Sequence, residues 1–97
     1  MLIRVVKMTF RPEAIGEFLA TFREFEDRIR GSEGCTHLEL WNDIKDPNVF
    51  FTYSHWEAEE FLNAYRHSET FGQVWPKTKA LFSDKAEAWS INKVSGL

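Results

Sequence analysis

The sequence predicts an α+β sandwich, in which an antiparallel four-stranded sheet carries helices on one face. Two observations point to this fold class. Stretches typical of strands and stretches with helical periodicity follow one another in the order βαββαβ. The 97 residues also have the size and the 43% hydrophobic content of one globular domain, and no repeat, linker or low-complexity tract divides them. We therefore expect a single domain over residues 1–97.

The first strand is expected over Leu2–Phe10, which is rich in β-branched and apolar residues. A helix then opens at residues 11–13, with Pro12 near the first helical position, where its missing N–H does no harm. Gly31 ends this helix, and residues 31–34 have the composition of a turn. The helix has one apolar face, formed by Ile15, Phe18, Leu19, Phe22, Phe25 and Ile29.

The second and third strands are expected over Cys35–Asn42 and Val49–Trp56, joined by a hairpin loop at residues 43–48. Aromatic side chains are dense from the third strand onward, and they include Phe50, Phe51, Tyr53, Trp56, Phe61, Tyr65, Phe71 and Trp75. Rings beside a few polar groups are what a pocket for a flat organic molecule needs, although core packing is the simpler role for most of them.

The second helical region begins near Glu57. Ser68 is expected to cap the start of a further helical segment, which Pro76 should kink or restart because proline lacks the backbone donor. Ala86–Lys93 reads as the last strand, with Trp89 and Ile91 at alternate positions. The resulting βαββαβ order is that of the ferredoxin-like sandwich.

Both faces of the predicted sheet are apolar. In the first strand, one face carries Ile3 and Val5 and the other carries Val6, Met8 and Phe10. In the third strand, one face carries Phe50 and Trp56 and the other carries Phe51 and Tyr53. Helices cover only one face, and an apolar sheet face of this size is usually an interface. We therefore expect a homodimer that packs sheet against sheet about a two-fold axis.

Composition and charge exclude two other classes of partner and indicate a cellular compartment. The net charge of −3 provides no basic surface for nucleic acid. No apolar stretch approaches the roughly 20 residues that span a bilayer, and the N-terminal residues lack a signal-peptide pattern, so no membrane partner is expected. The single cysteine, Cys35, excludes an internal disulfide and fits a reducing compartment, which places the protein in the cytoplasm.

Pairing across the hairpin could bring two histidines together. It would align His37 with His55, Glu39 with Tyr53 and Trp41 with Phe51. No short His-x-x-x-His motif or acidic cluster supports a metal site there, so no metal is expected.

The chain resembles the antibiotic biosynthesis monooxygenase family of dimeric α+β barrels. The resemblance rests on Gly34-Cys35 at the start of the second strand, on Tyr53-Ser54-His55-Trp56-Glu57, and on residues 61–68, followed by Phe71. It implies a pocket between helices and sheet in each subunit. Members of the family oxidise quinols and aromatic polyketides without metal or flavin, others degrade haem, and many have no known activity.

The resemblance also suggests site residues. Polyketide-oxidising members use an Asn on the third strand, a Trp four residues later and a Tyr in the next helix. Trp56 matches the Trp, whereas Thr52 stands at the Asn position and Leu62 at the Tyr position. Tyr65, on the same side of the helix, is the candidate substitute for the Tyr.

Haem degradation is not expected. The haem-degrading members use an Asn on the first strand with a Trp and a His in the second helical region. The positions that align with them here hold Lys7, Tyr65 and Trp75, so the axial histidine is replaced by a side chain that cannot bind iron.

The leading hypothesis is a monooxygenase that oxidises a small phenolic or quinol-like aromatic compound with dioxygen and without a bound cofactor. Two alternatives stay open, a non-catalytic carrier or sensor of a small molecule and an interaction module that acts through its sheet dimer. The expected catalytic residues are Trp56, Tyr65, His67 and Lys7, and the expected substrate-binding residues are Thr52, Phe22, Trp75 and Asn92. The competing structural roles are a helix-capping imidazole for His67 and a solvent-reaching ammonium for Lys7.

Overall fold

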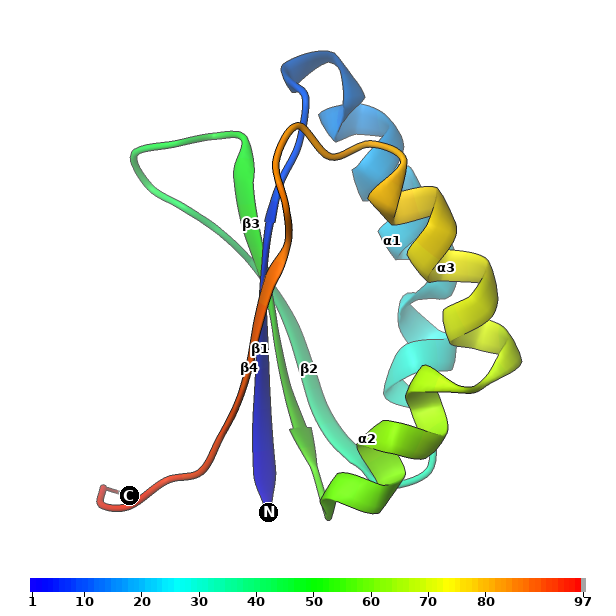
Figure 1. Ribbon diagram of the computed structural model, residues 1–97, viewed down its shortest axis with the longest axis vertical. Helices are drawn as coiled ribbons and strands as arrows, with labels where there is room; N and C mark the ends of the chain where they lie inside the picture. The colour runs from blue at the N-terminus through cyan, green and yellow to red at the C-terminus, as the bar shows by residue number, and fades with distance from the viewer. Residues whose placement is uncertain (97) are drawn as a thin grey trace.

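The computed structural model describes residues 1–96 and confirms the predicted α+β sandwich (Figure 1). Its elements are β1 (Leu2–Thr9), a 3₁₀ turn (Pro12–Ala14), α1 (Ile15–Arg30), β2 (Cys35–Asn42), β3 (Val49–Trp56), α2 (Glu59–Arg66), α3 (Glu69–Lys79) and β4 (Glu87–Ile91). The strands form one antiparallel sheet in the order β2-β3-β1-β4. In Figure 1 the helices lie together on one side of this sheet and leave the other side bare.

The hairpin between β2 and β3 has the register that the sequence predicts. His37 lies opposite His55, Glu39 opposite Tyr53 and Trp41 opposite Phe51. The register is interrupted only near Cys35, where an irregularity occurs at the start of β2. Which side chains share a face of these two strands therefore follows from the sequence pattern alone.

Two features of the helices bear on the expectations from the sequence. The first helix begins as the 3₁₀ turn at Pro12–Ala14 before it becomes α1. The last helix does not restart at Pro76, because α3 continues through it to Lys79. The carbonyl of Gly72, which loses its N–H partner at Pro76, belongs to an exposed residue and can bind water instead. Ser68 caps α3 as predicted, since its Oγ accepts a hydrogen bond from the Phe71 N–H (3.2 Å).

Part of the hydrophobic core is a cluster of three phenylalanine rings at the end of the sandwich where β1 leads into α1. Phe10 is fully buried, and its ring stacks on Phe18 with 4.1 Å between centroids. Both rings also contact Phe50 from β3, at 5.8 and 5.4 Å. These three rings join β1, α1 and β3, and they fix the distance between the helical layer and the sheet at this end.

The two faces of β1 have different surroundings. Arg4, Val6 and Met8 point under the helices, where they line a cavity. Ile3, Val5 and Lys7 alternate with them and so point to the bare face. The same alternation divides β3 into residues beneath the helices and residues on the outer face. We call the bare side of the sheet the outer face.

Gly34 occupies a position that no other residue can fill without strain. Its φ of +81° is in the left-handed region. A Cβ placed there would lie 2.3 Å from Cγ of Phe61, the ring that packs against it from α2. The close approach holds the start of α2 against the start of β2, and the Glu57 N–H donates a hydrogen bond to the Gly34 carbonyl (2.8 Å).

We predict that Gly34→Ala lowers the free energy of unfolding by about 2 to 4 kcal/mol, because left-handed strain adds to the clash with Phe61. Urea denaturation measures the loss. Gly16→Ala is the matched control, since Gly16 is an exposed helical glycine whose added Cβ would meet nothing within 4 Å. That variant should be neutral or more stable by up to about 1 kcal/mol. Equal effects of the two changes would contradict the prediction.

Candidate functional site

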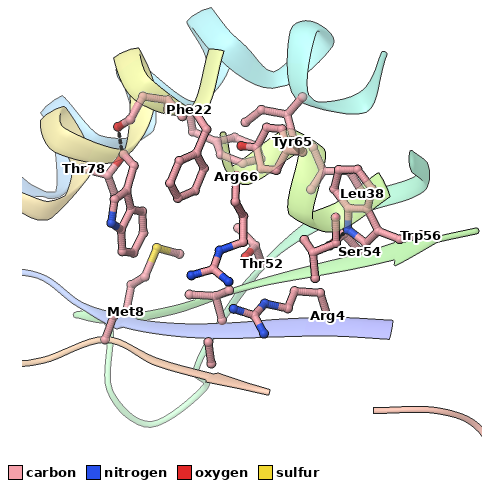
Figure 2. Close-up of a pocket in the computed structure, with 18 of the residues that line it drawn as sticks. Arg4, Met8, Phe22, Leu38, Thr52, Ser54, Trp56, Tyr65, Arg66 and Thr78 are labelled. Carbon is pink, nitrogen blue, oxygen red and sulfur yellow. Dashed lines mark hydrogen bonds between the residues drawn. The ribbon is translucent and has the colours of Figure 1, made fainter. Parts of the chain in front are cut away.

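A cavity of about 230 Å³ lies between the helices and the sheet (Figure 2). Ala86, just before β4, and Ala88 within it contribute only methyl groups to the cavity lining. Phe22 of α1 and Val74 of α3 close it from the helical side. A protein cavity of about 150 Å³ can bind benzene, so this one has room for a small aromatic molecule.

Four rings form a continuous row along the cavity, which we call the aromatic row. Trp56 stacks on Tyr65 (5.2 Å between centroids), Tyr65 meets Phe71 edge to face (5.3 Å), and Phe71 stacks on Trp75 (5.7 Å). The row begins at the end of β3 and continues along α2 and α3. All four rings line the cavity and give it an aromatic wall.

Trp56 anchors the aromatic row. It is only 1% exposed, and its Nε1 donates a hydrogen bond to Oγ of Ser54 (3.0 Å). This bond satisfies both polar groups within β3. The indole N–H is therefore committed to the protein, and Trp56 presents only ring surface to a ligand.

Two hydroxyl groups on the cavity wall, in contrast to the indole N–H of Trp56, are available to a ligand. Within residues 1–96, neither the Thr52 hydroxyl nor the Tyr65 hydroxyl has a protein hydrogen-bond partner. Burial raises the pKa of Tyr65 well above its ordinary value, and the nearby Cys35 raises it further. Tyr65 therefore keeps its proton at neutral pH and can donate a hydrogen bond but cannot serve as a base.

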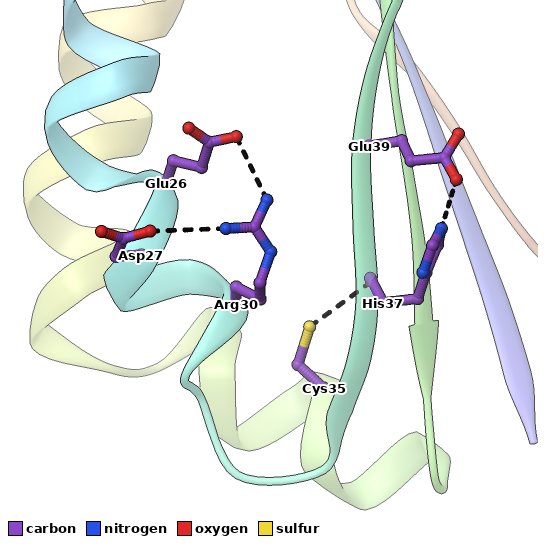
Figure 3. A network of polar contacts seen from close by, with 6 residues as sticks. All are labelled: Glu26, Asp27, Arg30, Cys35, His37 and Glu39. Carbon is purple, nitrogen blue, oxygen red and sulfur yellow. Dashed lines mark hydrogen bonds and ion pairs between the residues drawn. The ribbon is translucent and has the colours of Figure 1, made fainter.

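Cys35 lies near Tyr65 of the aromatic row, at the start of β2. Burial raises the pKa of its thiol, against the opposing effects of the His37 backbone and the charge of Arg30. The thiol donates a weak hydrogen bond to the His37 carbonyl (3.6 Å), as Figure 3 shows. Arg30 itself pairs with Glu26 (3.2 Å) and Asp27 (3.4 Å) on α1.

Two arginines also line the cavity, and the sequence interpretation missed both. Figure 2 shows the guanidinium of Arg66, which comes from the end of α2, beside that of Arg4 on β1. Burial lowers the pKa of Arg4, and the positive charge of Arg66 lowers it further. The parity of Arg4 with Val6 and Met8 was the available indication, because residues two apart share a face of a strand.

The family model for antibiotic biosynthesis monooxygenases matches residues 1–75. The chain belongs to the antibiotic biosynthesis monooxygenase family. The search of curated proteins gave no match.

Solved structures have the same fold over nearly the whole chain. A crystal structure of an antibiotic biosynthesis monooxygenase matches with a TM-score of 0.92 and 25% identity, covering 98% of this chain and 100% of the other. A conserved protein from Methanosarcina mazei Go1 matches at 0.90 and 22%, covering 96% and 93%. A protein from Nitrosomonas europaea matches at 0.89 and only 10%, covering 98% and 100%. The last two comparisons concern the fold alone.

Five of the eight residues proposed from the sequence meet at the cavity of this family member. Trp56 and Tyr65 belong to the aromatic row, and Trp75 extends it along α3. Thr52 and Phe22 line the cavity from the sheet and from α1.

The other three lie elsewhere. Lys7 is on the outer face, between Phe51 and Glu87 in the register of the sheet, because it has the parity of Ile3 and Val5. Its expected place under the helices is not the one observed.

His67 and Asn92 are exposed and do not line the cavity. His67 follows α2, and its Nδ1 donates a hydrogen bond to the Asn63 carbonyl (2.8 Å). This is the capping role that competed with catalysis in the sequence interpretation. Asn92 lies just beyond the end of β4, which stops at Ile91 rather than at Lys93.

Two negative findings complete the description. Among residues 1–96, no three His, Cys, Asp or Glu side chains are grouped so that they could hold a metal ion. None of the helices in the same range is long and apolar enough to cross a membrane.

The raised pKa of Tyr65 predicts a loss of stability in alkaline solution. In the unfolded chain Tyr65 ionises near its ordinary pKa of 10.0, and in the folded protein it ionises at higher pH. The contribution of Tyr65 to the free energy of unfolding is therefore fully present below about pH 10. It declines as pH rises toward the pKa of Tyr65 in the folded protein, by at most about 1.4 kcal/mol per pH unit. Urea denaturation at about pH 9 and pH 11 should show a smaller decline for Tyr65→Phe than for the native sequence. Identical declines in both proteins would refute the prediction.

Proposed function

We propose that this chain is a cytoplasmic monooxygenase that uses dioxygen to oxidise a small phenolic or quinol-like compound, without a bound cofactor. The observation that carries the proposal is the combination of the aromatic row with the two unpartnered hydroxyls of Thr52 and Tyr65 in one apolar cavity. Family membership supports the reaction class. The free Cys35 is consistent with a reducing compartment.

The cavity suits the first part of this chemistry. An aromatic substrate would lie against the aromatic row, and its oxygen would meet the hydroxyls of Thr52 and Tyr65. Loss of the phenolic proton leaves a negative charge on that oxygen. Hydrogen bonds from the two neutral hydroxyls would stabilise the charge, and the surrounding rings would limit the number of water molecules around it.

The oxidation then needs no other reagent than dioxygen. The phenolate passes one electron to dioxygen, which yields an aryloxyl radical and superoxide. The two combine to form a carbon–oxygen bond at a ring carbon that carries hydrogen. Cleavage of the O–O bond and loss of that C–H proton release water and leave a quinone. One oxygen atom thus enters the product and the other leaves as water.

The proton of the phenol has to leave by a route that involves neither His67 nor Lys7. Neither residue lines the cavity, and among its described lining residues there is no carboxylate or imidazole. The lining includes the exposed residues Arg66 and Ala88, which mark an opening to solvent. We propose that the proton passes to water through this opening.

Oxygen uptake with a panel of hydroquinones and anthrones tests the proposal. Thr52→Val and Tyr65→Phe should each lower kcat/KM by about tenfold to a hundredfold, because each removes one donor to the developing charge. Thr36→Val is the matched control, since Thr36 is an exposed β2 residue outside the cavity. Labelled dioxygen should deliver one atom to the product. Consumption of oxygen that neither cavity variant alters would show that the reaction occurs elsewhere.

The second candidate is a carrier or sensor that binds an aromatic molecule without converting it. The absence of a carboxylate or imidazole base among the described cavity residues favours this candidate, because a binding protein needs none. Ligand-dependent quenching of tryptophan fluorescence without any oxygen uptake would decide for it.

We also propose that the protein is a homodimer that packs through the outer faces of two sheets. Trp41, Trp89 and Ile91 are 41%, 43% and 48% exposed on this side. Their polar neighbours are already paired, since Trp41 Nε1 donates to Glu39 (2.7 Å) and His55 shares a hydrogen bond with Tyr53 (2.8 Å). Apolar rings and polar groups that are already paired lower the cost of burying this part of the face.

Sedimentation velocity tests the dimer. We expect Trp89→Glu to shift the protein to monomer, because a charge would have to be buried in the interface without a partner. Ile44→Glu serves as the control, since Ile44 is fully exposed in the β2–β3 loop. A native protein that sediments as a monomer at micromolar concentration would overturn the dimer.

A further inference from the structure

The guanidinium groups of Arg4 and Arg66 form a concentrated positive charge at the cavity. One comes from the sheet and the other from the last residue of α2, and Figure 2 shows them side by side next to Thr52. They are positively charged, whereas the rest of the lining is almost entirely apolar or neutral. A ligand that fits this site would therefore need an anionic group for the two arginines and an apolar group for the cavity.

No carboxylate of residues 1–96 neutralises this pair. The ion pairs in that range include Arg11 with Glu13 (3.9 Å) and Arg30 with Glu26 (3.2 Å), but none involves Arg4 or Arg66. The chain does not lack acids, since it has 15 Asp and Glu residues against 12 Lys and Arg. The positive charge at the cavity is therefore a local feature that an anion could neutralise.

Arg4 is held in position for such a role. Its Nη1 donates a hydrogen bond to Oγ of Ser90 on β4 (2.9 Å), and the two residues are register partners across the β1–β4 pair. A guanidinium has five N–H donors, so this bond leaves most of them available. Partial burial and the neighbouring charge of Arg66 lower the pKa of Arg4, as expected for two like charges that lie close together.

We propose that Arg4 and Arg66 bind the oxyanion group of an aromatic ligand, a carboxylate or a phosphate ester, while its ring occupies the cavity against the aromatic row. An oxyanion placed between two guanidinium groups accepts paired hydrogen bonds and removes their mutual repulsion. The inference rests on the proposed function only for the location of the ring. It identifies the ligand class as anionic arenes and disfavours neutral ones of the same shape.

Three probes of similar shape separate charge from ring binding, namely 4-hydroxybenzoate, 4-hydroxyphenyl phosphate and the neutral 4-hydroxybenzamide. Isothermal titration calorimetry should give the native protein at least about tenfold higher affinity for one of the anions than for the amide. The difference should shrink as salt is added, because salt screens the charges. Preference for benzoate over phosphate, or the reverse, identifies which oxyanion the site favours.

Arg4→Gln and Arg66→Gln should each weaken binding of the preferred anion by about tenfold or more and leave binding of the amide unchanged. Arg23→Gln is the matched control, since Arg23 is an exposed arginine of α1 outside the cavity. The ligand-free Arg66→Gln protein should melt at the native temperature or above it, because the substitution removes a repulsion. A purely structural role for Arg66 would instead lower the melting temperature.

Equal affinity of the native protein for benzoate, phosphate and amide probes would overturn the inference and leave the aromatic cavity intact. Loss of anion binding in Arg23→Gln equal to that in Arg66→Gln would also overturn it. Tight anion binding without oxygen uptake would instead support the inference and remove the oxygenase proposal, so the two can fail separately.

Discussion

The alternation of side chains along β1 and β3 is the constraint on which the rest of the molecule depends. Residues two apart share a face, so one face of these central strands carries the cavity and the other carries the outer face. A shift of one residue in register would exchange the two sets. The Phe10, Phe18 and Phe50 contacts and the Gly34–Phe61 contact oppose such a shift, because each fixes a helix to a particular strand position.

Local patterns account for most of the fold. The bounds of β2 and β3, the register of their hairpin and the cap at Ser68 all follow from short-range chemistry, and the structure confirms them. Of the two outcomes expected at Pro76, a kink or a restart, the restart does not occur, because α3 continues through it to Lys79. The end of β4 was placed too late, since no partner continues beyond Ile91 within the described residues.

The site could be predicted only in part, for a physical reason. Trp56 and Tyr65 are identified through the family resemblance, and both line the cavity. When both faces of a strand are apolar, however, the alternation does not say which face the helices cover. That ambiguity put Lys7 on the cavity side and left Arg4 unnoticed, although the two alternate in the same strand. Only the packing of α1 and α3 on the sheet decides between the two parities.

The partly buried thiol of Cys35 has a consequence for the proposed oxygen chemistry. Superoxide and peroxides react with thiolates far more readily than with thiols. Because partial burial raises the pKa of the Cys35 thiol and so favours its protonated form, this sulfur atom near Tyr65 would react more slowly with the superoxide of the proposed reaction. Under the proposed reaction, the same partial burial would limit oxidative damage to the chain.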